Sequence, residues 1–556
     1  MLPGPTESAV SFRVSEALSK QMLRRISVQT TRRTGLLLAI VIAVFCLLAA
    51  GLALTKRPWC DEAWFASIAY NLIHHGRMGM TVLDPHGFIF APVVKGIDRY
   101  TYWLMPAHAF MQVAWYKLFG FGLFAMRSMS IAWAAAAVAC WCFIVSRLTR
   151  SRMTGLIAAL LLAADQRFAL AAATGRFDVM CLALDLGSVA AYLFLRQRFW
   201  LAIIAGSTLL SLAFMTHPNG IFGVILLVAV MWQDRRRIEW STPFLAAAPF
   251  AIVFLLWGLY ILKAPDVFLA QVQVQSATPH RFFFDWNLIR HFREEFLQRF
   301  AYSYGLVSLS IRPILIGSPA LLYFVAVATL AVVAEIRNRP GAKFILILAT
   351  VDFTLLSCLE KHWIYLVYIL PAFSAAIAVV VTWLWQKGRA ARAITGVALA
   401  VILSLNFSVN AFRIIHNEKR FRYAKVIDYL TTHVPGNQLI MGSAELVFGL
   451  GFDRPFVDDC RLGFGSGRIA DYIVLETQYS YWFAYLAAHE QATYNYVRKT
   501  LDNDYEKVYD QAGDPYHSIG SWDQPYQVYK LKTSKEVMQS RRGGRAAIDV
   551  STARAR

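Results

Sequence analysis

The sequence is poor in charged residues. Only 16% of its 556 residues are Asp, Glu, Lys or Arg, whereas 57% are hydrophobic. Soluble globular chains carry about 25% charged residues, so this composition argues against a soluble enzyme and indicates a protein with several membrane spans. The mean hydropathy of +0.45 agrees with that interpretation.

Acidic residues are scarcer than basic ones. The chain has 35 Asp and Glu against 55 Lys and Arg, which gives a formal net charge of +20. The basic residues gather in short stretches between apolar runs, and such stretches are typical of the cytoplasmic loops of membrane proteins. We therefore attribute much of the charge to membrane topology and expect no nucleic-acid partner.

Cysteines are also few, and none follows the spacing of a metal site. Five of the seven fall in apolar runs, and Cys60 and Cys460 are the exceptions. These two could form a disulfide only if both faced an oxidising compartment. His74 and His75 are adjacent, but no set of further ligands accompanies them, so we predict no zinc site.

Long apolar runs are what the sequence has in excess. The first covers residues 35–54, which matches the roughly 30 Å core of a bilayer. It is longer than the ~7–15 apolar residues of a signal peptide, so we expect a retained helix. We predict about eleven membrane helices, at 35–54, 124–146, 153–173, 178–195, 200–216, 219–232, 242–262, 313–334, 343–359, 362–384 and 393–410.

Basic clusters occupy alternate gaps between these runs. They are Arg147 to Arg152, Arg196 and Arg198, Arg235 to Arg237, Arg337 to Lys343, and Lys387 to Arg392. The positive-inside rule places these loops and the N-terminal tail in the cytoplasm. Residues 101–119 would break the alternation if they crossed, so we predict that they lie in the outer interface. The outer loops are then 55–123 and 263–312.

After residue 410 the composition becomes polar and rich in turns. Short β-like runs appear in NQLIMGS, ADYIVLE and YQVYKLK, and helix-like stretches lie near 420–433 and 482–501. We predict four parts: a cytoplasmic basic tail (1–34), a membrane domain (35–410), an extracytoplasmic soluble α/β domain (411–535) and a disordered basic tail (536–556). The predicted fold class is a polytopic α-helical membrane protein with a small C-terminal α/β domain outside the membrane.

Ionisable residues gather at the predicted outer ends of the helices. They are Asp61 and Glu62, Arg176 and Asp178, His217, and Lys361 with His362. A carboxylate can take a proton from a hydroxyl group, and fixed cations can stabilise a leaving phosphate. Plainer explanations are open too, because acids cap helices, an arginine pairs with a nearby aspartate, and lysines anchor at the interface.

A set of motifs in a fixed order is more specific than any one of these residues. The set is DEAWFASIAYNLIHHG (61–76), YWLMPAHAF (102–110), FGLFAMR (121–127), ATGRFDVM (173–180), LAFMTHPNG (212–220) and KHWIYLVYILPAF (361–373). With these motifs the chain resembles the GT-C superfamily of membrane glycosyltransferases. Within it, the chain is most similar to glycosyltransferase family 39, the protein mannosyltransferase and aminoarabinose transferase family. The resemblance covers residues 35–410.

This resemblance implies an enzyme that moves a sugar from a polyprenyl-phosphate donor to a lipid, glycan or protein acceptor. The reaction would take place on the extracytoplasmic face of the cytoplasmic (inner) membrane, among membrane lipids, and would invert the sugar. In the family the first acid of the pair is the favoured base, which implies that Asp61 is the catalytic base and that Glu62 supports it.

The resemblance also implies a set of substrate-binding residues. These would be Arg176, Asp178, His217, Lys361 and His362. Many members carry a K-P-P sequence before the aromatic segment, whereas this chain has VKGIDRYTYW. Lys95 or Arg99 would then take the role of that lysine toward the donor phosphate.

We expect no required cofactor. A divalent ion between Asp61, Asp178 and a phosphate is an open alternative, because hard oxygen ligands favour Mg²⁺, Mn²⁺ or Ca²⁺. The main alternative function is a transporter or flippase of lipid-linked sugars, which calls for charged or broken helices near the membrane midplane. An assembly protein that keeps the fold without activity is another. The clustering of ionisable residues at one membrane face favours the enzyme.

Overall fold

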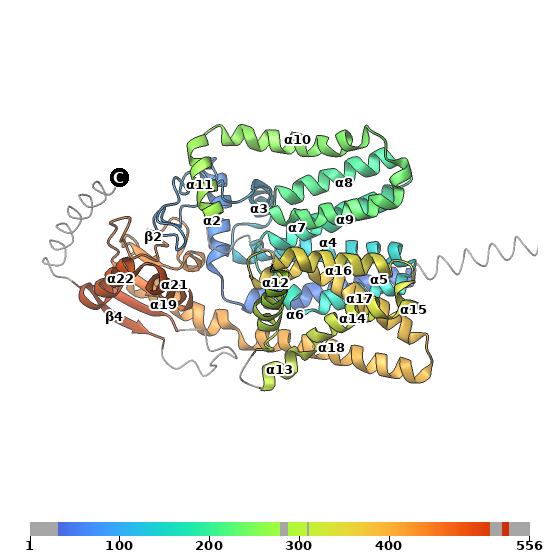
Figure 1. Cartoon of the computed structure of the whole chain (residues 1–556). Helices are drawn as coiled ribbons and strands as arrows, with labels where there is room; N and C mark the ends of the chain where they lie inside the picture. Colours follow the sequence, from blue (N-terminus) through green and yellow to red (C-terminus); the bar gives the residue numbers. More distant parts are fainter. Residues whose placement is uncertain (1–31, 278–286, 308–310, 512–524, 533–556) are drawn as a thin grey trace, which may run out of the picture.

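A computed structural model describes residues 32–277, 287–307, 311–511 and 525–532, which form a helical bundle beside a smaller domain with a sheet (Figure 1). The predicted C-terminal tail and nearly all of the N-terminal tail lie outside the described residues. The chain is a multi-pass membrane protein by the length and apolar composition of its helices. The smaller domain is built on a five-stranded sheet.

Seven described helices are long and apolar enough to cross a membrane, or eight with one bent pair. The seven are Arg32–Thr55, Leu123–Thr149 (α4), Asp178–Leu195 (α7), Thr242–Ile261 (α10), Pro313–Val332 (with α14, Leu321–Val332), Trp363–Trp385 (with α17, Leu366–Trp385) and Arg389–His433 (with α18, Arg389–His416). Three other predicted spans are helices of 16, 11 and 16 residues, namely Phe199–Phe214 (α8), Ile221–Met231 (α9) and Ala342–Ser357 (α16). All eleven predicted segments are therefore helical, and seven or eight have the length of a full span.

The predicted span 153–173 is not one helix. It consists of α5 (Arg152–Ala164) and α6 (Gln166–Ala172), which are bent by 67°. The side chain of Asp165 accepts two backbone N–H groups at the start of α6. Its other oxygen accepts the hydroxyls of Tyr304 and Tyr323, both at 2.7 Å. A buried carboxylate that is fully hydrogen-bonded thus holds the bend, which hydropathy alone does not reveal.

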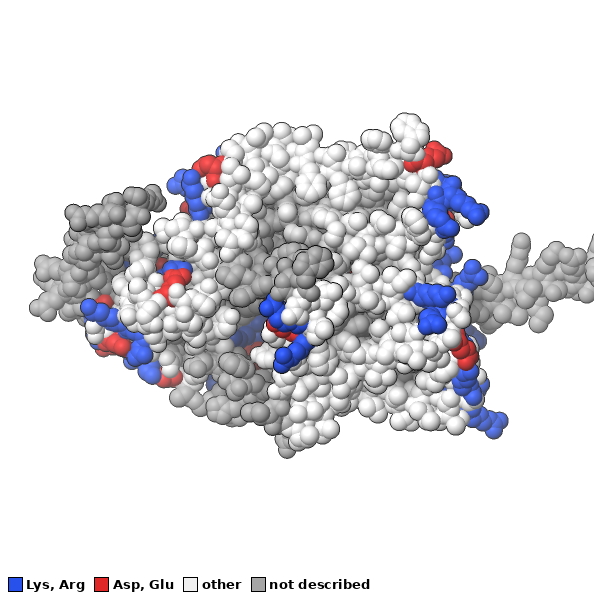
Figure 2. All heavy atoms as spheres, in the orientation of Figure 1, with Lys and Arg blue, Asp and Glu red and all other residues white. Residues whose placement is uncertain are grey.

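The basic loops meet at one end of the bundle (right in Figure 2). Arg196 pairs with Asp234 of the next such loop at 2.7 Å. Lys387 pairs with Glu335 at 2.7 Å, which joins two further loops. The predicted alternation of basic loops therefore matches the arrangement of the helices, because every second connection returns to this end.

The segment 101–119 forms α3 (Pro106–Phe119), a helix of 14 residues that packs on α2 (Cys60–His75) and α4. It is not among the described helices that are long and apolar enough to cross. The interfacial position of this segment stays a prediction. The remaining short helices are Pro265–Ala277 (α11), Leu288–Glu294 (α12), Ile311–Gly317 (α13) and Ala334–Arg337 (α15).

The smaller domain contains a mixed sheet with strand order β2-β1-β3-β5-β4. The strands are Ile440–Gly442 (β1), Phe456–Val457 (β2), Tyr472–Leu475 (β3), Tyr505–Asp510 (β4) and Gln527–Leu531 (β5). The helices are Ala424–His433 (α19), Val447–Leu450 (α20), Thr477–His489 (α21) and Gln491–Asp504 (α22). The three predicted strands are confirmed, but the helix predicted at 482–501 is two helices with a break at Glu490.

The predicted domain boundary at residue 410 falls inside α18, which continues to His416. The helix carries the chain out of the bundle and directly into the smaller domain (Figure 1). A change in composition therefore does not coincide here with the end of a secondary-structure element. The division into domains stays a prediction.

The smaller domain is attached to the loop that follows α2. The backbone of Asp458 bonds to Val82 at 2.7 Å and to Asp84 at 3.1 Å. The indole of Trp64 donates to the Asp458 carboxylate at 3.1 Å and its ring stacks on Trp482 at 6.2 Å. The smaller domain therefore contacts both α2 and the loop that follows it.

The question of a disulfide is answered by the position of the thiols. All seven cysteines are free. Cys60 lies beside Asp61, with its sulfur 3.6 Å from the carboxylate, whereas the Cys460 thiol donates to the carbonyl of Gly87 at 3.1 Å. Both residues are buried, and each thiol has a partner of its own.

The arrangement of the basic loops predicts which sites are reachable from outside intact cells. His75→Cys and Gly436→Cys are exposed substitutions on the outer side of this topology, and Arg236→Cys is exposed at the basic end. A membrane-impermeant maleimide is expected to label the first two and not the third. Labelling of Arg236→Cys alone would show that the chain has the opposite orientation in the membrane.

Candidate active site

Asp61 and Glu62 belong to the first turn of α2, but they face different surroundings. The helix starts at Cys60, and Glu62 is its third residue. The Glu62 carboxylate accepts the backbone N–H of Trp59 at 2.9 Å, which is how an acid at this position caps a helix. The capping explanation therefore accounts for Glu62 and leaves Asp61 without a structural task of that kind.

Glu62 forms a fully buried ion pair with Arg127 of α4. The guanidinium donates to both carboxylate oxygens at 2.7 Å, and the N–H of Gly175 donates to one of them at 2.9 Å. Burial raises the pKa of Glu62, but the adjacent guanidinium outweighs burial and lowers that pKa to about 2. Arg127 also donates to three carbonyls at the end of the first helix, those of Ala53, Lys56 and Arg57.

Arg176 lies between the other two acids. Its Nε donates to Asp178 at 2.9 Å, and its Nη1 is paired with Asp61. Asp178 is the first residue of α7, so the pairing predicted across the start of that helix is present. The structure thus brings Asp61, Arg176 and Asp178 together from segments 115 residues apart in the chain.

Aromatic rings surround the Arg176 guanidinium. Its centre lies 5.1 Å from the Trp59 ring, 5.6 Å from Phe65 and 5.1 Å from Phe177. Such rings attract a cation and exclude water, which strengthens the pairing with the two aspartates. Because the Nη2 atom makes no hydrogen bond to a described residue, the guanidinium keeps one edge for a further anion.

Asp61 is the most accessible of the three acids. Its side chain is 18% exposed, whereas Glu62 and Asp178 are completely buried. Burial raises the pKa of Asp61, and the nearby Arg176 opposes this without cancelling it. A carboxyl with a raised pKa and access to the surface is a suitable proton acceptor.

The two predicted histidines stack on rings of this cluster. His217 is 4.7 Å from Phe177 and nearly parallel to it, and His362 is 5.5 Å from Trp59. Each accepts a backbone N–H two residues further on, and so each also caps a short helical turn. Burial lowers the pKa of His362 to about 3, so this imidazole is neutral at physiological pH.

Lys361 lies behind the histidine and is held by an acid. Its ammonium pairs with Glu295 at 3.1 Å, and Arg299 pairs with the same carboxylate at 2.7 Å. Arg299 is fully buried and also donates to the carbonyl of Leu359. These contacts fix the loop that carries Lys361 and His362. They also mean that Arg299, a cation of the basic loop 263–312, is already paired within the protein.

Lys95 and Arg99 lie apart from the acid cluster. Lys95 pairs with Asp266 of α11 at 2.8 Å, and Arg99 is 3.9 Å from Asp98. The Lys95 and Arg99 side chains are 58% and 72% exposed. The structure does not bring either cation into contact with Asp61, Arg176 or Asp178, because a surface acid lies closer to each.

Two residues of the site were missing from the predicted set. Arg127 is the counter-ion of Glu62, and its presence in the motif FGLFAMR was the available signal. Lys56 donates to the hydroxyl of Thr174 at 3.0 Å and lies 5.9 Å from the Trp59 ring. A lysine on the predicted outer side departs from the positive-inside rule, and that departure was its signal.

The described residues contain no group of three or more His, Cys, Asp or Glu that could hold a metal ion. The two acids suggested as metal ligands both pair with Arg176. The position between Asp61 and Asp178 is therefore taken by a guanidinium, and these residues as arranged do not fit a divalent ion.

No protein-family model and no curated protein sequence matches the chain. Solved structures do match. ArnT from Cupriavidus metallidurans bound to undecaprenyl phosphate aligns with a TM-score of 0.53 over 89% of this chain and 98% of its own, at 15% identity. The Archaeoglobus fulgidus oligosaccharyltransferase in complex with Zn and sulfate aligns with a TM-score of 0.53 over 81% of this chain and 70% of its own, at 9% identity.

The chain has the GT-C fold. An alignment over 89% of this chain includes both the helical bundle and part of the smaller domain, so the fold implied by the motifs is confirmed. At this level of identity the GT-C fold is what the two chains share, and the chemistry rests on the residues of the site.

The buried ion pair gives a test of how the site is held. Replacement of Glu62 with Gln is expected to lower the melting temperature, because Arg127 would stay buried without a counter-charge, at a typical cost of about 3–5 kcal/mol. The double variant Glu62→Gln/Arg127→Met should recover part of the loss, because the unpaired charge is removed while three carbonyls lose the donor that Arg127 provides. The folded-state pKa of Glu62 is depressed, so the stabilisation is present above pH 4.5 and is lost as the pH falls toward 2. Differential scanning fluorimetry of the purified protein measures both effects, and an unchanged melting temperature for Glu62→Gln would contradict this role.

Proposed function

We propose that the protein is a glycosyltransferase that moves a sugar from a polyprenyl-phosphate donor to a hydroxyl acceptor. The observation that carries the proposal is a partly exposed carboxylate, Asp61, paired with an arginine that has a free donor edge. One group can remove a proton and the other can receive a phosphate. The GT-C fold supports the proposal, since ArnT of Cupriavidus metallidurans has this fold and binds undecaprenyl phosphate.

In the proposed reaction the acceptor hydroxyl attacks the anomeric carbon of the donor sugar. Its proton passes to the Asp61 carboxylate as the new bond between oxygen and carbon forms. The bond between the anomeric carbon and the phosphate oxygen breaks, and polyprenyl phosphate leaves with the electron pair. A single displacement of this kind inverts the anomeric centre.

Cations at the cluster would stabilise the charge that develops on the leaving phosphate. Arg176 offers its Nη2, and Lys56 offers an ammonium whose described partner is the hydroxyl of Thr174 rather than a carboxylate. Both lie over the Trp59 ring, at 5.1 and 5.9 Å. Burial lowers the pKa of Lys56 to about 8, so the ammonium is largely charged at neutral pH and gains from a nearby anion. Lys95 and Arg99 would meet the donor only outside this cluster.

The remaining predicted residues would position the site in this scheme. Glu62 has both oxygens occupied and a low pKa, so it would orient the turn that carries Asp61 rather than move a proton. His217 and His362 would support Phe177 and Trp59, and Lys361 would order the loop that carries His362. Asp178 would orient Arg176 and keeps one buried oxygen, Oδ1, without a partner among the described residues.

We further propose that this site faces the extracytoplasmic side of the cytoplasmic membrane. The basic loops lie at the opposite end of the bundle from α2 and the smaller domain (Figures 1 and 2). A donor attached to a polyprenyl chain would keep its tail in the bilayer and present its sugar at this rim. The acceptor would be a lipid, a glycan or a protein of the cell envelope.

Transport of lipid-linked sugars is the second candidate, and two buried acids favour it. Asp185 of α7 and Asp352 of α16 lie inside the helical bundle, and each has an oxygen without a described hydrogen-bond partner. Acids within membrane helices often mark ion or substrate pathways. The two candidates therefore assign function to different carboxylates of the chain.

One comparison of variants separates the two functions. Asp61→Asn is expected to lower sugar transfer by about 10²–10⁴-fold, the range for a lost general base, while the protein still folds and inserts. Asp185→Asn serves as the matched control and should retain transfer within about 3-fold, because Asp185 lies about two helical turns along α7 from Asp178 and makes no described hydrogen bond to Asp61 or Arg176. Transfer from undecaprenyl-phosphate sugars in proteoliposomes is the measurement. Turnover of Asp61→Asn at the wild-type rate would reject Asp61 as base, and a loss confined to Asp185→Asn would favour transport.

The pH dependence of transfer is a second test. Asp61 must be ionised to accept a proton, so the rate should fall as the pH drops through its pKa, which lies above the ordinary value of 3.8. Arg176 lowers that pKa, and Arg176→Gln should therefore move the acid limb of the rate profile to higher pH by about one unit or more, besides lowering the maximal rate. An acid limb that stays in place, or moves to lower pH, would contradict the pairing as the source of the profile.

A further inference from the structure

A small, partly open cavity lies beside the Asp61 cluster and is lined by residues of α2 and α3. Its volume is about 10 Å³, which is the room of a single water molecule or hydroxyl group. Most of its wall is apolar and comes from Phe65, Ile68, Met78 and Leu104. A polar group in such a cavity finds few hydrogen-bond partners. The polar side chains in the lining are therefore the ones that could bind it.

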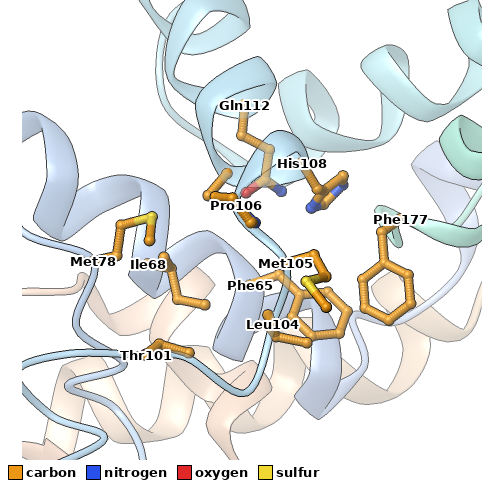
Figure 3. A pocket seen from close by; sticks show the side chains of 11 residues that line it. Phe65, Ile68, Met78, Thr101, Leu104, Met105, Pro106, His108, Gln112 and Phe177 are labelled. Atoms are coloured by element: carbon orange, nitrogen blue, oxygen red, sulfur yellow. The ribbon is translucent and has the colours of Figure 1, made fainter. Parts of the chain in front are cut away.

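Two polar side chains of α3 line this cavity, His108 and Gln112. Figure 3 shows them on the same face of the helix, as expected for residues four positions apart. Their exposed fractions are 4% and 0%. The Nε2 of His108 and both amide atoms of Gln112 have no hydrogen-bond partner among the described residues.

Three buried polar atoms without partners are unusual in one small cavity. Buried donors and acceptors are nearly always paired, because leaving them unpaired costs stability. Burial also lowers the pKa of His108 to about 3, so its ring is neutral. A neutral imidazole and an amide together offer donors and acceptors, and a hydroxyl group can use both at once.

Two aromatic rings, Phe65 and Phe177, belong both to the cavity lining and to the surroundings of Arg176. The His108 ring lies edge-on to Phe65 and Phe177, at 6.1 and 6.0 Å. The same two rings lie 5.6 and 5.1 Å from the centre of the Arg176 guanidinium. Phe177 lines the cavity and stands between Arg176 and Asp178 in the chain. A group held by His108 and Gln112 would therefore lie next to the proposed reaction centre.

We propose that this cavity is a subsite for one hydroxyl group of a substrate, which His108 and Gln112 hold by hydrogen bonds. The proposal rests on the proposed function, because a glycosyltransferase binds a sugar substrate with several hydroxyl groups. The hydroxyl comes either from the donor sugar or from the acceptor. In the free protein, a water molecule has the size and the hydrogen-bonding capacity to occupy the same position.

The test uses the full-length protein in lipid nanodiscs with Gln112→Met and His108→Phe. Ser130→Ala is the matched control, because Ser130 has a buried hydroxyl without a described partner outside this cavity. Binding is measured for undecaprenyl phosphate and for undecaprenyl phosphate carrying mannose, arabinofuranose, aminoarabinose or galacturonic acid. Transfer is measured with the same donors and a titrated extract of envelope lipids and glycans.

If the hydroxyl belongs to the donor, the variants lose about 10-fold in affinity for a sugar lipid that wild type binds, and none for undecaprenyl phosphate. If it belongs to the acceptor, binding of both lipids is unchanged and the half-saturating acceptor concentration rises about 10-fold at a similar maximal rate. The melting temperature stays the same or rises in both cases, because the amide and imidazole are removed without loss of a protein hydrogen bond.

Affinities and acceptor dependence equal to those of Ser130→Ala would overturn the proposal, and a lower melting temperature with unchanged affinities would assign the cavity to a structural water. A wild-type protein that transfers none of the sugars would instead count against the proposed function. The lipid-binding comparison still reports on the cavity in that case, so the two failures are distinguishable.

Discussion

The arrangement of the site depends on one buried ion pair, between Glu62 and Arg127. A carboxylate and a guanidinium without access to water are stable only when nearly all their hydrogen-bonding groups are used. Here the carboxylate binds Arg127, the start of α2 and the backbone of Gly175, and the guanidinium binds carbonyls at the end of the first helix. Three segments that are distant in sequence, at residues 53–62, 127 and 175, are thereby fixed to one another. Asp61 precedes Glu62, and Arg176 follows Gly175, so their meeting is a direct result of this pair.

The three acids of the candidate site, Asp61, Glu62 and Asp178, have different surroundings. Glu62 is paired on both oxygens and has a low pKa, whereas Asp61 keeps some access to the surface and has a raised pKa. Asp178 is buried at the start of α7, where it holds Arg176. Divergent environments for neighbouring carboxyls are a common feature of sites that move protons. Aromatic rings on three sides of Arg176 keep this arrangement away from bulk water.

Much of the fold could be predicted from the sequence, because a bilayer imposes a length and an apolar composition on each helix. The eleven helical segments, the helix α3 and three strands of the smaller domain follow from such local patterns. The bend at Asp165 does not, since it depends on hydroxyls of Tyr304 and Tyr323 more than a hundred residues away. The surface pairing of Lys95 with Asp266 is likewise a contact between distant segments, which no spacing within a motif encodes.

The central claim is that the donor phosphate binds at Arg176 and Lys56, next to Asp61, and one measurement tests it most directly. Cryo-electron microscopy of the protein in nanodiscs with undecaprenyl phosphate would show where the phosphate lies. The account predicts phosphate density within hydrogen-bonding distance of the Arg176 Nη2, above the Trp59 ring and beside the Asp61 carboxylate. Density at Lys95 and Arg99 alone, or at the end of the bundle that carries the basic loops, would contradict it.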